Sequence, residues 1–367
     1  MAWEDLTIPK SEGGLGIKKL EDWKKAGLAK HLWKICLHNP TSNWATWARA
    51  NLLRGRSIWD IKVPTNCSWT WRKLLKIRSL FRPHIRYMVG NGQLTWLWFD
   101  FWLPMGPIHP TMGDRVIYDS GLQRHAKVAT IIRNGEWRWP LANSNELLTL
   151  KEAIPQEMIP HMDMEDSIIW ALTPSGNFTT KSAWEAVRRS HPPAIWSKLL
   201  WFHGNIPRAA FILWLAIRGR LSTHDRSHIP QVDPGRCLLC DAAPESHHHL
   251  FFECPMSMQI WHSILQKGHL SVPHLPWEAL IGWLSSNWNG AVLSSRILKL
   301  CLAVTVSSIW QERNTRLHEN SHQNVASIMH MILETVRMCL STYRRVENNE
   351  INRNHQQDWA LPDSIYA

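Results

Sequence analysis

Three cysteines and a run of three histidines between positions 237 and 254 constrain this chain more than any other feature. Cys237 and Cys240 are two residues apart, and Cys254 follows the histidines. Two thiols at this spacing reach one ion from a tight turn, and a histidine and a cysteine five residues apart complete a tetrahedron. The pattern C-x2-C-x8-H-x4-C therefore predicts one structural Zn²⁺, with no open coordination position, held by Cys237, Cys240, His249 and Cys254.

Two alternatives stay open at this cluster. His247 and His248 are rival ligands to His249. The cysteines could also be ordinary core residues beside a histidine run, although free cysteines rarely gather at ligand spacing. Three thiolates around a divalent ion leave a net charge near minus one, so the metal would not attract phosphates. Neighbouring Arg and Lys side chains would have to do so.

Length and composition favour a basic protein with large aromatic cores. The chain has 367 residues, enough for two or three structural units, and 24 of them are Trp. The seven cysteines show no disulfide pattern, which favours a reducing compartment. Residues 1–5 do not resemble a signal peptide, and the longest apolar run, Leu300–Trp310, is too short to span a bilayer. We expect an intracellular, soluble protein of the nucleus or cytoplasm, without membrane contact.

Hydrophobic spacing predicts a predominantly helical α+β fold. Residues 1–58 form a helical connector, with helices starting near Leu20 and at Asn43. Residues 59–190 form a Trp-rich α+β region with a helix over 68–81. We expect a β-hairpin at Asn91-Gly92 and a second strand–turn–strand unit over 167–180, followed by a helix. Short helices are expected over 126–133 and 145–153.

The rest of the chain is predicted to be helical around the metal. A zinc-binding module spans 191–268, with a buried helix from Pro207 and another helix after the last thiol. A helical region follows over 269–347, and the polar tail 348–367 is expected to fray. The small β-hairpin units thus precede the helical zinc-knuckle module and the C-terminal helical region.

The distribution of charge points to a polyanionic partner, RNA or DNA. The formal net charge is +11, and no Asp or Glu occurs between Ile61 and Phe99. The alternative is a solvated basic face over a Trp-rich core. Nucleic-acid contact is predicted for two groups of basic residues, one in this region and one beside the thiols: Arg72, Lys73, Lys76, Arg78, Arg82 and Arg86, and Arg218, Arg220 and Arg236.

Several spaced motifs resemble a known family. Gly219-Arg-Leu-Ser-Thr-His-Asp225, the cysteine pair and Glu245–Pro255 resemble the zinc-binding region of reverse transcriptases from plant non-LTR, LINE-type retrotransposons. Trp98–Leu103 and Trp310-Gln-Glu-Arg-Asn314 resemble flanking segments of the same polyproteins. The resemblance implies that the metal ligands are the three cysteines and the histidine before Leu-Phe-Phe, which is His249.

The same resemblance implies that the catalytic part is missing. The family's polymerase domain carries an adjacent pair of aspartates that hold two metal ions, and this chain contains no Asp-Asp pair. We expect a C-terminal fragment of a retroelement polyprotein, without polymerase, endonuclease or ribonuclease H. A reverse transcriptase acting in trans is a further partner that the resemblance allows.

Three classes of function follow from these observations. The leading one is a non-catalytic zinc-binding accessory module that binds RNA or DNA. The alternative is a structural or protein-interaction module, or a retroelement relic, that binds no nucleic acid. An enzyme is disfavoured, because no spacing motif ties His203, His224, Asp225, His247 or His248 to a nucleophile. The sequence leaves the oligomeric state open.

Overall fold

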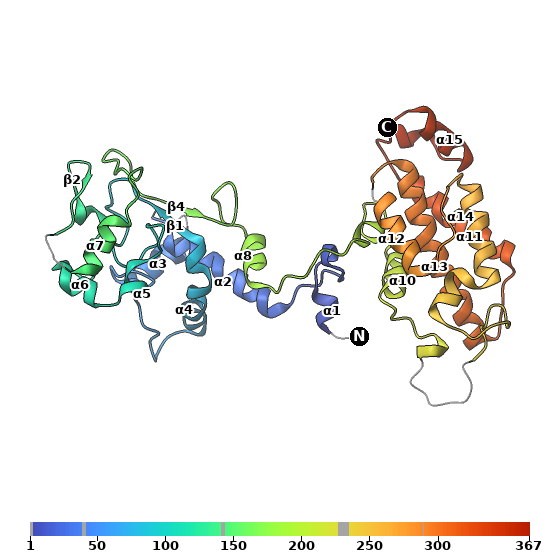
Figure 1. The fold of residues 1–367 in the computed structure, drawn as a ribbon, viewed down its shortest axis with the longest axis horizontal. Helices are drawn as coiled ribbons and strands as arrows, with labels where there is room; N and C mark the ends of the chain where they lie inside the picture. The colour runs from blue at the N-terminus through green and yellow to red at the C-terminus, as the bar shows by residue number, and fades with distance from the viewer. Residues whose placement is uncertain (1–2, 39–41, 141–143, 227–234, 289) are drawn as a thin grey trace. The chain divides into compact units, whose positions relative to one another are not determined.

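The chain folds into two compact units of different composition. The computed structural model describes residues 3–38, 42–140, 144–226, 235–288 and 290–367. One unit, called here the inserted unit, spans Lys18–Ser190 (Figure 1). The other, called the zinc unit, consists of the residues up to Ile17 together with His191–Ala367. The predicted class, α+β and predominantly helical, is confirmed, whereas the five-segment division of the chain stays a prediction.

Three helices build the core of the inserted unit. Helix α2 (Leu20–Cys36) packs against both α4 (Trp69–Phe81) and α8 (Thr180–Val187). Helix α4 begins where the Ser68 side chain accepts a hydrogen bond from the Trp71 amide, and it buries the apolar face predicted from its spacing. The remaining helical segments are α3 (Asn43–Ala48), continued as the π turn η2 (Arg49–Leu53), η3 (Arg82–His84), α5 (Ile108–Met112), α6 (Arg115–Ser120), η4 (Val128–Ile131) and α7 (Asn145–Glu152).

The hairpin predicted at Asn91-Gly92 is wrong. Strand β1 (Ile85–Met88) instead pairs antiparallel with the distant β4 (Ser167–Trp170), in a register that sets Ile85 opposite Trp170. The physical reason is the Asp166 carboxylate, which accepts four backbone N–H groups of the segment after β1, at 2.8 or 2.9 Å. Those donors are therefore not available for a returning strand.

Two glycines allow this segment to lie so close to its neighbours. A Cβ atom at Gly90 would lie 2.2 Å from the Met164 carbonyl oxygen. At Gly92, where φ is +72°, it would lie 2.5 Å from the Ala129 amide nitrogen. A different Asn-Gly pair, Asn134-Gly135, joins β2 (Ile132–Arg133) to β3 (Glu136–Trp137), where a helix was predicted up to residue 133.

The second predicted strand–turn–strand unit is also only half formed. Strand β4 exists, but the chain after its turn starts a helix rather than a strand. Thr179 caps α8 by accepting the Ser182 amide at 3.1 Å, so its hydroxyl favours a helix start over strand pairing. The two ladders of the described residues are thus short, and neither is a hairpin at a predicted position.

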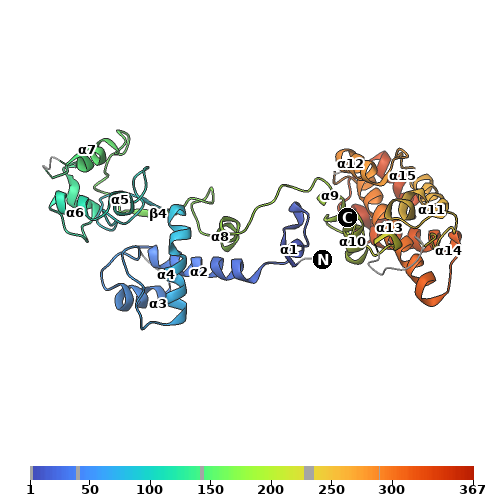
Figure 2. The ribbon, with the colours of Figure 1, turned by 60° about the horizontal axis from the view of Figure 1, so that its bottom comes forward.

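In its described part, the zinc unit is built from helices joined by loops, with a single β-bridge between Arg236 and Pro244. Helix α13 (Leu293–Glu319) contacts α10 (Pro207–Ile217), α11 (Pro255–Lys267) and α14 (Val325–Leu340), as Figure 2 also shows. Further helical segments complete the unit: α1 (Trp3–Thr7), η1 (Lys10–Glu12), α9 (Ser197–Leu200), η5 (His224–Arg226), η6 (His249–Glu253), α12 (Trp277–Asn287), α15 (Glu350–Asp358) and η7 (Asp363–Tyr366).

Helix α13 is the one described helix whose length and composition could cross a membrane, and it is longer than the apolar run predicted. Of its most apolar 18-residue window, 78% is buried within the protein. Its C-terminal half also buries Glu312 and Arg313. These features are those of a core helix around which the other helices of the unit pack.

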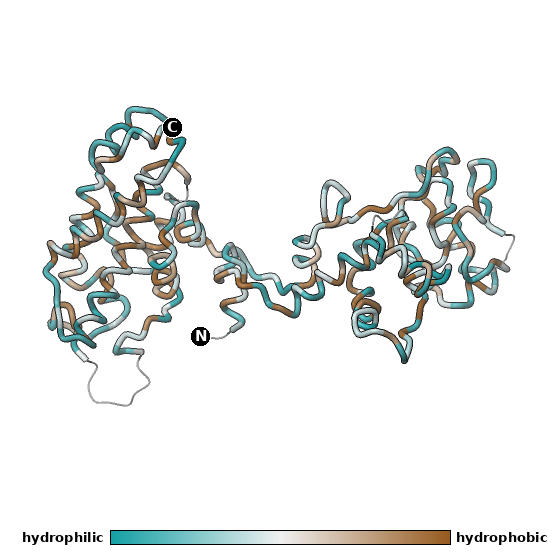
Figure 3. The backbone as a smooth tube through the Cα atoms, turned by 180° about the vertical axis from the view of Figure 1, so that it is seen from behind, coloured by the Kyte–Doolittle hydropathy of each residue, from teal (hydrophilic) through white to brown (hydrophobic). Residues whose placement is uncertain are grey.

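The prediction that the tail frays is wrong. Residues Glu350–Asp358 form α15, which is largely hydrophilic (Figure 3) and therefore gave no apolar periodicity. The helix starts where Asn349 accepts the Asn352 amide at 2.9 Å. Trp359, Leu361 and Ile365 are buried in the hydrophobic core of the zinc unit, so single apolar residues anchor a polar segment.

Candidate metal centre

The cysteine pair lies on a tight turn closed by backbone hydrogen bonds. The Asp241 amide donates to the Cys237 carbonyl oxygen at 2.8 Å, and the Cys237 amide donates to Ala243 at 2.8 Å. Asp241 adopts a φ of 53°, in the left-handed region that Asp tolerates better than most residues. Arg236 and Pro244 form an antiparallel bridge at the base of the turn. The segment is a knuckle that points two thiols in one direction.

A π turn brings the other two residues together. On an α-helix, residues five apart would point roughly 140° away from each other. In η6 the Cys254 amide instead donates to the His249 carbonyl oxygen, five residues back, at 2.7 Å. The wider turn sets both side chains on the side that faces the knuckle. Pro255 then occupies the first turn of α11, where its missing N–H is not needed.

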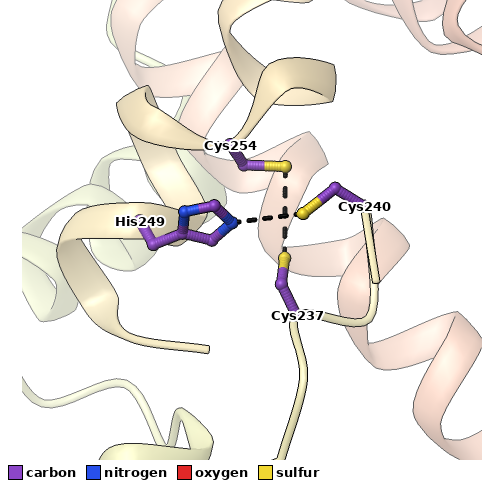
Figure 4. Close-up of side chains that lie close together, drawn as sticks. All are labelled: Cys237, Cys240, His249 and Cys254. Carbon is purple, nitrogen blue, oxygen red and sulfur yellow. Dashed lines mark hydrogen bonds between the residues drawn. The ribbon is translucent and has the colours of Figure 1, made fainter. Parts of the chain in front are cut away.

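The four side chains meet at one point, as Figure 4 shows. Their ligand atoms all lie within 4.8 Å of one another. The Sγ atoms of Cys237 and Cys254 are 4.0 Å apart, and Cys240 Sγ lies 3.3 Å from His249 Nε2. A tetrahedral zinc ion with Zn–S bonds of about 2.3 Å requires sulfur atoms separated by about 3.8 Å. The arrangement fits one zinc ion, and all four positions are taken by protein atoms.

The neighbouring histidines point elsewhere. His247 is buried, and its ring packs against Phe251 and Trp277 with centroids 5.0 and 5.2 Å away. His248 faces solvent, where its Nδ1 lies 3.3 Å from a carboxylate oxygen of Glu278. Among the three histidines, His249 has its ring nitrogen in the cluster.

The two hydrogen-bonded thiols of the cluster differ from each other in acidity. A hydrogen bond from Cys237 lowers the pKa of Cys254 to about 5, and the same hydrogen bond together with burial raises the pKa of Cys237. Burial raises the pKa of Cys36 to about 12, and it also raises the pKa of Cys301 and of Cys339. Among these cysteines, the one whose pKa is lowered, Cys254, lies in the cluster.

A cation from α13 supports the knuckle. The Nη1 atom of Arg316 donates to the carbonyl oxygens of Leu238 and Leu239, both at 3.0 Å. Glu312, one turn earlier, holds the guanidinium through an ion pair of 2.7 Å. Arg316 therefore fixes the two residues between Cys237 and Cys240 and brings positive charge beside a thiolate cluster.

A second, fully buried contact joins α13 to the segment that follows the knuckle. Arg313 Nη2 lies 2.8 Å from Glu245 Oε1, and both side chains are almost inaccessible to solvent. The same carboxylate accepts the His224 amide at 3.0 Å. The motif 310–314 was noted in the sequence only as a resemblance, and its contact with Glu245 was missed. Glu245 and Arg313 each lie in a motif that resembles the family, but the sequence alone does not show that the two side chains contact each other.

Of the predicted nucleic-acid residues on and after α4, only some point into solvent. Lys73 and Lys76 are exposed, and Arg72 donates to the Thr65 carbonyl oxygen at 2.8 Å. Arg78 and Arg82 are half-buried and donate to the carbonyl oxygens of Ile58 and Phe99; burial lowers the pKa of Arg82 to about 10. Arg86 stacks 3.6 Å from the Phe101 ring centroid.

The predicted residues beside the knuckle also differ from one another. Arg218 and Arg220 both pair with Asp5 of α1, at 2.7 and 3.5 Å. Arg236 is exposed and donates to the Asp241 carbonyl oxygen at 3.2 Å. Nucleic-acid contact by these residues stays a prediction, and the structure reduces the number of cations that face solvent without an acidic neighbour.

Fold and cluster together define a helical, structural zinc-binding domain. Residues 178–261 match the family described as zinc-binding in reverse transcriptase. The chain thus contains a segment similar to the zinc-binding domain of reverse transcriptases, and this segment includes all four ligands.

Two proteins of Arabidopsis thaliana are similar to this chain. One, named as a ribonuclease H protein, is 24% identical over 308 residues, which cover 78% of this chain and 47% of the relative. The other, an uncharacterized mitochondrial protein, is 29% identical over 114 residues, or 30% of this chain and 73% of the relative. The chain spans about half the length of the ribonuclease H relative. No solved structure matches.

Proposed function

We propose that this protein is a non-catalytic accessory module of a retroelement-derived reverse transcriptase, in which zinc holds a helical unit together and basic surfaces bind RNA or DNA. A structural role for the metal is supported mainly by the four protein ligand atoms, which all lie within 4.8 Å of one another. With three thiolates and one imidazole, a zinc ion keeps no position for water or substrate. Its contribution is therefore to folding.

The chemistry around the cluster supports the same role. The two residues between the first ligands are held by Arg316, and the segment after the knuckle is held by Arg313. Both arginines come from the core helix α13, so metal binding and packing of that helix stabilise each other. Structural zinc contributes about 10 kcal/mol to the folding of small domains.

Nucleic-acid binding is supported by the charge of the inserted unit. Between residues 23 and 99 the sequence contains one acidic residue, Asp60, and its carboxylate is paired with Arg124 at 2.6 Å. Lys73 and Lys76 are exposed on α4, and within the described ranges no carboxylate pairs with either. Such a surface attracts phosphates without regard to base sequence.

The proposal that the module is non-catalytic rests on the family that it matches. The matched family covers a zinc-binding domain, and the printed name of one relative refers to ribonuclease H, an activity that we assign to that relative alone. We further propose that the segment derives from a plant LINE-type element and works beside a polymerase supplied in trans inside the cell.

A binding titration across salt concentrations tests this proposal. Purified protein, with its zinc content determined, is titrated against labelled single-stranded RNA and DNA. Phosphate contacts predict an affinity that falls steeply with log salt. A zinc-loaded, folded protein that binds neither nucleic acid even at low salt contradicts the proposal and favours the protein-interaction module.

A further inference from the structure

A groove in the inserted unit combines one exposed and one half-buried tryptophan ring with arginines. It has a volume of about 520 Å³ and lies between the segment of α3 and η2 and the loop that leads into α4. This volume falls within the range of about 300 to 1,000 Å³ that is usual for ligand pockets. No acidic side chain is among its lining residues, which include Trp44, Trp47, Arg54, Arg56 and Trp71.

The tryptophans that line the groove differ in how far they are exposed to solvent. Trp71 is 3% exposed and forms part of the core, whereas Trp47 is 53% exposed. Trp44, one turn before Trp47 on α3, is half-buried and held edge-on by the His31 ring, with centroids 4.9 Å apart. An exposed indole ring loses the benefit of burial, so the position of Trp47 at a groove beside Trp44 indicates a partner with flat apolar faces.

Two arginines line the same groove, and each is held by a hydrogen bond to a backbone carbonyl oxygen. Arg54 adopts a φ of 49°, and its Nε donates to the Asn51 carbonyl oxygen at 3.0 Å. Arg56 donates from Nε to the Leu53 carbonyl oxygen at 3.3 Å. Each guanidinium is exposed and keeps further N–H groups for a ligand, and in the described part of the chain no carboxylate pairs with either.

We propose that this groove binds single-stranded nucleic acid, with a base stacked on Trp47 and the adjoining phosphates bound by Arg54 and Arg56. The inference rests on the proposed nucleic-acid binding and assigns it to a site that the sequence did not reveal. A single strand is the occupant that fits, because it offers an unpaired base face and phosphates side by side. In a duplex both faces of each base are covered by neighbouring bases.

Anisotropy titrations with a labelled oligouridylate of about 12 nucleotides test this site, because known sites take about 4 to 16 nucleotides. Trp47→Ala is expected to weaken binding about 10-fold at every salt concentration, since stacking carries little net charge. The double variant Arg54→Ala/Arg56→Ala is expected to flatten the slope of log affinity against log salt by about 1.4 units. Trp47→Phe keeps a ring and is expected to restore most of the affinity.

Trp3→Ala is the matched control, because Trp3 is 59% exposed and lies in the zinc unit. It is expected to bind like the unsubstituted protein. If Trp47→Ala binds as tightly as this control, or if a duplex of the same length competes as well as the single strand, the groove is not the site, although the proposed function stands. If the unsubstituted protein binds no nucleic acid, the proposed function and this inference both fail.

Discussion

The guanidinium of Arg313 lies 2.8 Å from the carboxylate of Glu245 in an ion pair that solvent hardly reaches. One partner belongs to the longest helix of the zinc unit, and the other follows the knuckle that carries the first two thiols. Because the carboxylate also accepts the His224 amide, three separate segments meet at one buried charge. The zinc site is therefore part of the core of its unit rather than an attached finger.

Removing the cation from this pair should destabilise the zinc unit. Arg313→Ala leaves the Glu245 carboxylate buried without its partner, which costs about 3 to 5 kcal/mol in comparable cases. Urea unfolding monitored by circular dichroism measures the effect. The matched control is Arg337→Ala, which breaks the exposed pair with Glu334 and should leave the unfolding curve unchanged. Equal unfolding midpoints for the two variants would contradict the central role of the pair.

Metal content should depend on one histidine of the three. His249→Ala removes the ring nitrogen that lies 3.3 Å from Cys240 Sγ, so zinc should be lost in large part. His248→Ala, at the solvent-facing position, should keep one zinc per chain, and His247→Ala should keep it with weaker packing. Metal analysis of the purified variants decides the matter. Equal zinc retention in all three would refute the ligand set.

Asp166 should be essential for the inserted unit. Its carboxylate accepts four backbone amides and the Thr95 hydroxyl, so Asp166→Ala leaves five buried or half-buried donors without an acceptor. We expect a loss of about 3 kcal/mol or more in unfolding free energy. Thermal unfolding compared with Asp163→Ala, an exposed neighbour, measures it.

The same residue predicts a dependence of stability on pH. Burial alone would raise the pKa of Asp166, but the hydrogen bonds to its charged form hold that pKa below the ordinary value. A depressed carboxyl pKa stabilises the fold above the unfolded value of about 3.9, and the contribution is lost as pH falls below it. The difference in unfolding free energy between the unsubstituted protein and Asp166→Asn should therefore shrink in acid. A constant difference from pH 7 to pH 3 would argue against the linkage.

Three basic residues of α4 should contribute to the salt dependence of binding. Replacing Arg72, Lys73 and Lys76 together by Ala removes up to three phosphate contacts and should flatten the salt slope by about two to three units. Folding and zinc content should not change, because none of the three side chains is buried. A variant that folds, keeps zinc and binds single-stranded RNA with an unchanged slope would show that this is only a solvated helix face.

Purified protein should show no primer extension on RNA or DNA templates. The chain contains no adjacent pair of aspartates that could hold two catalytic metal ions. Incorporation of nucleotides that depends on the template and survives further purification is the result that overturns this expectation.

Local patterns predicted the parts of the fold that depend on neighbours in sequence. Helices α2, α4 and α10 follow from apolar spacing and their first residues, and the ligand cluster follows from the spacing of Cys237 and Cys240 before His249 and Cys254. The π turn that aligns the last two ligands has no sequence signal of its own.

Features that depend on distant partners could not be predicted in the same way. The pairing of β1 with β4 is set by Asp166, more than seventy residues from the amides that it binds. The groove at Trp47 was missed because an exposed and a buried tryptophan look alike in a sequence. The positions of Arg78 and Arg82 could not be predicted either, because an arginine that donates to a backbone carbonyl oxygen looks in a sequence like one that faces solvent.

The zinc unit is discontinuous in sequence, and this affects the order in which it can form. The Trp214 indole donates to the Gly13 carbonyl oxygen at 2.9 Å, and the Ala194 amide donates to Ser11 at 2.9 Å. During synthesis, the N-terminal segment of this unit, which carries α1 and η1, therefore lacks its partners until the whole inserted unit has left the ribosome. The inserted unit can fold before its host, and a chain in which a short linker replaces residues 18–190 should still assemble the metal-bound helices.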